Sequence, residues 1–325
     1  MQQMNRWIAT GLIALSSAAA ACGGKDTTSV TPPDTTGNNP PPVDTTTHPQ
    51  PVDTSYALVA LAGNIAKCTN DNDAATAAVI AAMPATTTVI ALGDNALPSG
   101  RAVDYTTCYD ATWGQFKTRT YAVLGTHEYD SSTTAAGAVA YFGDRAGPAG
   151  KGYYSFDVGA WHVVVLNTSN NPTVSYGATS EQQLWLQSDL DANAGKKCVM
   201  AVWHDPRFMS STTAGFTERP NQTSLWNRLY AAGVDVIVNG GQHQYERFAP
   251  MDAAGVRNDS TGMREFVSGM GGDSYAAPTA IANNSEVLGG SYGVLQMKLF
   301  SNRYEWTFAS IAGQTFTDTG SGTCH

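Results

Sequence analysis

The sequence predicts a layered α/β domain with mixed sheets, and three observations carry this prediction. Short apolar runs that end at glycine alternate with helix-forming segments, which is the pattern of strand–helix–strand units. The first such unit, residues 56–92, implies parallel strands joined by a right-handed crossover. Two further runs are separated only by Gly159-Ala160, which favours an antiparallel pair.

Each element has its own local signal. The segment 73–83 is rich in alanine and is stopped by Pro84; 180–193 begins at a capping serine, Ser180; and 224–232 is stopped by Gly233, so all three predict helices. The apolar runs predict strands over 56–61, 87–92, 121–124, 153–158, 161–166, 198–202, 234–238, 265–268, 293–300 and 304–309.

The first residues predict an exported chain. Arg6 precedes an apolar or small segment, Trp7 to Ala21, that has the length of a signal-peptide core and is shorter than the roughly 20 apolar residues of a membrane-spanning helix. The segment runs directly into Cys22, which resembles the lipid-attachment motif of bacterial lipoproteins, although Ala19 stands where that motif usually has leucine. We expect a lipoprotein-type signal peptide over 1–22; an ordinary signal peptide cut in the same alanine run is the alternative.

Residues 23–54 predict a disordered linker, which leaves 55–325 for the domain. Residues 25–54 contain seven proline and nine threonine residues. The segment therefore has too few apolar side chains to offset the conformational entropy that ordering it would cost. The whole chain has a formal net charge of -9, which argues against nucleic acid or an anionic lipid surface as a partner. Membrane contact is expected only through the N-terminal lipid anchor, at the cell envelope, either the outer membrane or the cell surface. The oligomeric state stays open.

The cysteines agree with export. Apart from Cys22, the chain has Cys68, Cys108, Cys198 and Cys324, and an even number in an exported chain suggests two disulfides. Three pairings are possible. We favour Cys68–Cys108 and Cys198–Cys324, because each would join segments that the expected fold brings close.

Polar residues follow five of the predicted strands. Because the carboxyl ends of strands line the ligand crevice of open α/β folds, these turns should converge on one site. The residues concerned are Asn64, Asp94, His127, His204 and His243.

The ordered set of motifs resembles a known family. LGDN (92–95), GTHEYD (125–130), VWHDPRF (202–208), QYERFAP (244–250) and the run GQTFTDTGSGTCH (313–325) resemble the calcineurin-like metallophosphoesterases, especially secreted forms akin to purple acid phosphatases. The resemblance covers nearly all of 56–325. It implies a layered α/β/β/α sandwich that hydrolyses a small phosphoester with two divalent ions of zinc, iron or manganese.

The resemblance also assigns roles to single residues. Asp94 would bridge the two ions, His243 would bind the first ion and His204 the second, and His127 would protonate the leaving group, oriented by a carboxylate such as Glu128. Other ligand positions are substituted. Asn64 is a weak neutral ligand in place of aspartate, Thr126 is a doubtful one in place of asparagine, and Leu97 and Gly241 offer none.

Two hypotheses from different classes follow. In the first, the chain is a membrane-anchored phosphoric ester hydrolase with a degenerate metal site, holding one ion or two, in which Asp94, His204 and His243 form a two-histidine, one-carboxylate site. In the second, it is an inactive pseudophosphatase that keeps the crevice for a ligand or partner. The substitutions at ligand positions motivate both.

Overall fold

The computed structural model describes residues 54–169 and 173–325. The expected signal peptide with Cys22, and the expected linker up to residue 53, lie outside the described residues. Within the described part of the chain, no helix combines the length and apolar character needed to cross a membrane.

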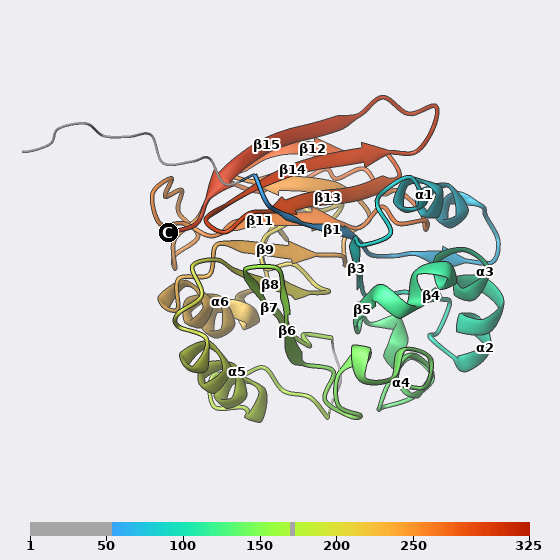
Figure 1. The fold of residues 1–325 in the computed structure, drawn as a ribbon, viewed down its shortest axis with the longest axis horizontal. Coiled ribbons are helices and arrows are strands. Elements are labelled where there is room, and N and C mark those ends of the chain that lie inside the picture. Colours follow the sequence, from blue (N-terminus) through green and yellow to red (C-terminus); the bar gives the residue numbers. More distant parts are fainter. Residues whose placement is uncertain (1–53, 170–172) are drawn as a thin grey trace, which may run out of the picture. The chain divides into compact units, whose positions relative to one another are not determined.

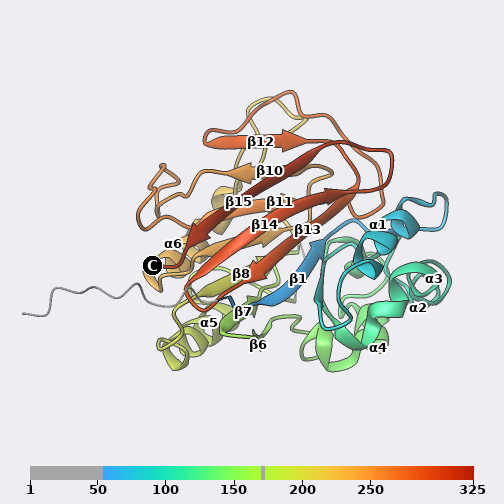
Figure 2. The ribbon, with the colours of Figure 1, turned by 45° about the horizontal axis from the view of Figure 1, so that its top comes forward.

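Two mixed sheets form the centre of the domain (Figures 1 and 2). The first has six strands in the order β15 (Thr317–Thr323), β14 (Arg303–Ser310), β13 (Gly293–Leu299), β1 (Ala57–Ala62), β3 (Thr88–Leu92) and β5 (Thr120–Val123). The second has seven, in the order β12 (Ser285–Gly289), β10 (Tyr245–Phe248), β11 (Arg264–Ser268), β9 (Val236–Asn239), β8 (Val199–Trp203), β7 (Trp161–Val165) and β6 (Tyr154–Val158). A two-stranded ribbon pairs β2 (Ala66–Lys67) with β4 (Ala96–Leu97).

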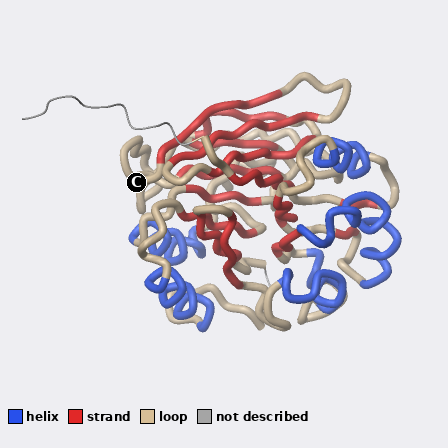
Figure 3. Tube along the Cα trace, viewed as in Figure 1, coloured by secondary structure: helices blue, strands red, loops and turns tan. Residues whose placement is uncertain are grey.

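The helices form two groups with the strands between them (Figure 3). One group is α1 (Asn72–Ala81), α2 (Ala102–Asp104), α3 (Asp110–Thr112) and α4 (Ala136–Phe142). A π-helical turn, η1 (Tyr105–Tyr109), joins α2 to α3. The other is α5 (Glu181–Ala192) and α6 (Thr223–Ala231). Short 3₁₀ turns are η2 (Trp113–Arg119), η3 (His127–Tyr129), η4 (Gly143–Ala146) and η5 (Pro220–Gln222).

The alternation of side chains along each strand produces three apolar layers. On β1, Val59 and Leu61 join the core between the two sheets, whereas Ala60 and Ala62 face the first helical group. On β7, Val163 lies between the sheets and Val164 packs with α5 and α6. Strands buried on both faces read as continuous apolar runs, which is why the sequence shows them clearly. The result is the predicted α/β/β/α sandwich.

Most predicted elements are confirmed within one or two residues. Ser180 caps α5 as expected, because its side chain accepts a hydrogen bond from the Gln183 backbone N–H. The sequence did not predict the strands β2, β4, β10, β12 and β15 or the short helices α2, α3 and α4. Strand β15, TDTGSGT, is a polar edge strand that is held by its pairing with β14 and not marked by its composition.

Both favoured disulfides are present. Cys68 is bonded to Cys108, and Cys198 to Cys324. The second bond ties the residue before β8 to the one that follows β15, so it joins the two sheets.

Candidate active site

The candidate site, which the sequence predicts to be a crevice, lies where the turns that follow parallel strands are bonded to one another. The Asn64 N–H donates to Gly93 O at 3.0 Å, which joins the turns after β1 and β3. The Gly240 N–H donates to His204 O at 3.0 Å, which joins the turns after β9 and β8. A Cβ at Gly63 would lie 2.7 Å from the Gly240 Cα, so the turns of the two sheets are in direct contact.

Glycine permits the closest approaches in this crevice. A Cβ on Gly93, which has a φ of +90°, would lie 2.4 Å from His204 Nδ1. A Cβ on Gly125 would lie 2.3 Å from the Asp94 N. Any side chain at either position would separate the turns that carry the site.

Asp94 and His204 form a buried pair at the centre. His204 Nε2 lies 3.1 Å from Asp94 Oδ2, and the side chains are 2% and 8% exposed. On the far side of the ring, Nδ1 lies 2.8 Å from Leu92 O, and an acceptor there fixes the proton on Nδ1 and turns Nε2 toward the carboxylate. Asp94 itself has a φ of 52°, a conformation that few non-glycine residues adopt and that clusters at functional sites.

The two charges reinforce each other. Burial alone would lower the pKa of His204, but the Asp94 carboxylate outweighs it and raises that pKa to about 10. Burial would likewise raise the pKa of Asp94, and the charges of His204 and His127 hold it below its usual value instead. Without a metal ion, the pair is therefore an imidazolium facing a carboxylate.

His127 borders this pair and is partly exposed. Its backbone N–H donates to Asp94 Oδ1 at 2.8 Å, and its Nε2 lies 3.9 Å from Asp94 Oδ2. Its Nδ1 lies 2.6 Å from Asp130 Oδ2. Burial opposes ionisation of the ring, but the carboxylates of Asp94 and Asp130 outweigh it and raise the pKa of His127.

The carboxylate that orients His127 is Asp130 and not Glu128, which corrects the expectation from the sequence. Glu128 is fully buried and accepts hydrogen bonds from the backbone N–H groups of Asp94, Asn95 and Gly125 at 2.7–2.8 Å. It therefore locks the turns after β3 and β5 together. Its pKa is raised by burial and then by the nearby Asp94 charge.

Asn64 contributes to the fold of the crevice through its amide group. Its Nδ2 donates to Gly240 O at 2.9 Å and to Gly269 O at 3.1 Å, and the residue is 1% exposed. Both amide hydrogens are thus used in holding the turns after β9 and β11. Thr126, the other substituted ligand that the sequence named, is exposed.

His243 contacts a different group of residues. Its Nδ1 lies 2.7 Å from Ser274 O and 3.6 Å from Asp273 Oδ2. Asp273 in turn pairs with Lys67 at 2.6 Å. The structure thus joins Asp94, His204 and His127, and places His243 in a neighbouring cluster with Asp273 and Lys67.

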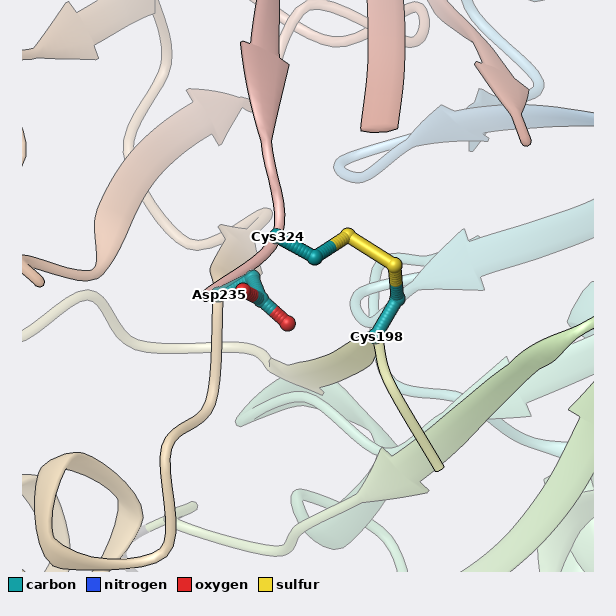
Figure 4. Close-up of side chains that lie close together, drawn as sticks. All are labelled: Cys198, Asp235 and Cys324. Carbon is teal, nitrogen blue, oxygen red and sulfur yellow. A yellow bond between two sulfur atoms is a disulfide. The ribbon is translucent and has the colours of Figure 1, made fainter. Parts of the chain in front are cut away.

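The described donors do not fit a two-metal centre. Among the described residues, the one group of three histidine, cysteine or acidic side chains with ligand atoms within 4.8 Å of one another is Cys198, Asp235 and Cys324. Figure 4 shows that its two sulfurs form a disulfide, so they are not thiolate ligands. In the crevice, two donors, Asp94 Oδ2 and His204 Nε2, have the separation of adjacent ligands around one ion, whereas catalytic zinc sites usually have three protein ligands.

By sequence, the chain is similar to purple acid phosphatases of Arabidopsis thaliana. It is 38% identical to purple acid phosphatase 21 over 101 residues, which are 30% of this chain and 22% of that protein. It is 30% identical to purple acid phosphatase 15 over 151 residues, 42% of this chain and 27% of that protein. These matches span less than a third of either relative. No protein-family model matches the chain.

Solved structures agree with the fold. A purple acid phosphatase, PPD1, from yellow lupin (Lupinus luteus) seeds has a TM-score of 0.61 at 17% identity, covering 82% of this chain and 53% of that one. A dimetal phosphatase from Danio rerio has a TM-score of 0.56 at 16% identity, covering 83% and 99%. GAP50, the anchor in the inner membrane complex of Plasmodium, has a TM-score of 0.63 at 14% identity, covering 83% and 89%.

The two-sheet sandwich and its crevice of strand-end turns define a metallophosphoesterase fold. The chain is therefore similar to purple acid phosphatases in sequence and to metallophosphoesterases in fold.

Sequence reasoning missed two neighbours of the candidate site, and each had a weak signal. Asp130 is three residues after His127, the spacing that one helical turn brings together. Asp273 follows Gly271-Gly272 at the end of β11 and so belongs to a sixth strand-end turn.

Proposed function

We propose that this chain is an exported, membrane-anchored phosphoric ester hydrolase of the metallophosphoesterase type, with a degenerate site that holds one divalent ion. The observation that carries the proposal is the contact of Asp94, His204 and His127 at the strand ends. Export and anchoring rest on the segment 1–22 and on Cys22, and the two disulfides favour an oxidising compartment.

In this proposal, Asp94 Oδ2 and His204 Nε2 hold the ion. A bound divalent ion neutralises phosphate charge and lowers the pKa of a coordinated water. The Leu92 carbonyl keeps the His204 ring oriented by accepting from its Nδ1, which is the arrangement of many metal-binding histidines. Zinc, iron and manganese all suit a site with one imidazole and one carboxylate.

His127 is the group suited to proton transfer. Asp130 holds its Nδ1, which leaves Nε2 as the atom that can deliver a proton to the leaving oxygen. The side chain is 42% exposed, so a substrate can reach it. The raised pKa favours the protonated form of the ring, which an acid requires.

The test uses the full-length chain, purified and analysed for bound metal. Hydrolysis of aryl phosphate monoesters and diesters is measured with added Zn²⁺, Mn²⁺ and Fe²⁺, with and without chelator. We expect hydrolysis that is lost with chelator and with His204→Ala. Activity that survives both changes would place the reaction elsewhere in the molecule.

The alternative, a catalytically silent module that binds a ligand or partner, is an outcome of the same experiment. It is established if the unaltered chain binds no metal and shows no turnover, and if turnover appears only when ligands are restored by Asn64→Asp with Thr126→Asn. Gly241→His belongs in a later step, because its Cβ would lie 2.9 Å from His204 O and the backbone must shift to accept it.

A further inference from the structure

The crevice contains a second charged pair beside Gly241, the position where the family resemblance expects a metal-binding histidine. A Cβ at Gly241 would lie 3.2 Å from Asp205 Oδ1. The same Asp205 Oδ1 lies 3.0 Å from Arg219 Nη2. The carboxylate thus stands between the missing side chain and a guanidinium.

Arg219 is held in place by its backbone. Its N–H donates to Arg207 O at 2.9 Å, and its carbonyl accepts from the Gln222 N–H at 3.0 Å, where η5 leads into α6. Its side chain also lies over the Phe216 ring, with 5.4 Å between the guanidinium carbon and the ring centroid. A group that is already ordered loses little freedom when it binds a ligand.

The guanidinium of Arg219 carries more N–H donors than Asp205 can accept. An arginine carries five N–H donors; the Nε of Arg219 is buried, so a ligand would meet the two Nη groups, of which Nη2 pairs with Asp205. The ion pair with Asp205 is partly open, since the side chains are 25% and 17% exposed. The Tyr176 hydroxyl is a polar neighbour: burial and then Asp205 raise its pKa, and Arg219 opposes them.

We propose that Arg219 is a recognition residue for the phosphoryl group of the substrate, and that Asp205 occupies its guanidinium until the anion competes for it. Planar guanidinium groups bind phosphate oxygens in pairs, and a tetrahedral dianion offers more acceptor charge than one carboxylate. This inference rests on the proposed function, because it names what that crevice binds.

The experiment titrates inorganic phosphate into the full-length chain, observed by calorimetry, in chelator and again with Zn²⁺. Arg219→Met keeps the length of the side chain and removes its charge. We expect it to weaken phosphate binding at least about tenfold, the loss expected for one charged hydrogen-bonding group. Asp205→Asn removes the competing charge, and we expect tighter binding.

The matched control is Arg257→Met, because Arg257 is an exposed arginine paired with Asp259 and Glu286. It should leave phosphate affinity unchanged, and thermal melts should show all variants folded. Arg219→Lys should restore part of the affinity if charge is what matters.

Three results overturn the inference. They are no phosphate binding by the unaltered chain, equal affinity in Arg219→Met, or weaker binding in Asp205→Asn. Phosphate binding that depends on Arg219 in a chain without ester turnover would refute the proposed hydrolase and leave this inference standing. Turnover with affinity independent of Arg219 would do the reverse.

Discussion

The two sides of the crevice use similar motif positions in different ways. On the Asp94 side, which comprises Asp94, His127 and His204, ionisable groups face one another at 3.1–3.9 Å. On the Asn64 side, which comprises Asn64 and His243, the amide binds backbone carbonyls and the imidazole lies against Ser274 O. The difference teaches that strand-end turns can bring ionisable groups together on one side while side chains on the other side bind the backbone.

The largest effect should come from Asp94→Ala. If the Asp94 side performs hydrolysis, this change should lower kcat/KM for an aryl phosphate at least about a thousandfold, since it removes a carboxylate that no other described group in contact with His204 replaces. Asp191→Ala on the exposed face of α5 is the control and should leave the rate unchanged. Comparable rates in the two variants would remove the Asp94 side from the mechanism.

Glu128→Gln should destabilise the domain by about 3 kcal/mol. The carboxylate accepts three backbone N–H groups, and an amide cannot accept all three without turning its own N–H₂ toward one of them. Tyr105→Phe, which removes only the hydroxyl that donates to Glu128, should cost about 1 kcal/mol. Urea unfolding measures both, and similar values for the two variants would contradict the anchoring role.

Asn64→Asp tests the Asn64 side. A buried carboxylate in place of the amide leaves Gly240 O and Gly269 O without donors, so we expect a loss of about 2 kcal/mol in unfolding free energy without metal. Zn²⁺ should recover part of it if the restored carboxylate binds an ion. Asn302→Asp, at an exposed position, should change stability by less than about 0.5 kcal/mol. An unchanged stability of Asn64→Asp would show that its amide bonds are dispensable.

His162 gives a smaller, pH-dependent effect outside the crevice. It lies between Asp157 and Asp189, at 3.0 Å and 2.8 Å. Burial opposes its charge, but the two carboxylates outweigh burial and raise its pKa. A raised folded pKa stabilises the fold fully below the unfolded pKa of about 6.5, and this stabilisation is lost as pH rises through the folded value.

The His162→Gln variant should therefore lose most unfolding free energy relative to the unaltered chain at pH 6. This loss of unfolding free energy should be smaller at pH 9. Ser155→Ala, which removes a neutral hydroxyl bonded to Asp189, should give the same deficit at both values. Urea unfolding at the two pH values decides between them, and a His162→Gln deficit that grows with pH would reverse the assigned sign.

Sequence patterns predicted the individual strands and helices well because their signals are local, whereas the sandwich was implied by the family resemblance. Runs such as Val163 to Val165 are buried on both faces and therefore read as apolar throughout. The helix ends at Pro84 and Gly233 can be predicted from the sequence alone. The edge strands β15 and β12 were missed because their own residues give no clear strand pattern. Their hydrogen bonds come from the neighbouring strands β14 and β10.

The sequence by itself determined which chemical groups are present at the strand ends: a carboxylate at Asp94, an imidazole at His204, and no side chain at Gly241. Only the tertiary structure decided what these groups contact. It set His204 on Asp94, turned His243 toward Asp273, and brought Arg219 to Asp205. The physical reason is that residue identity fixes charge and hydrogen-bonding capacity, whereas partners far apart in sequence are chosen by the packing of two sheets and their turns.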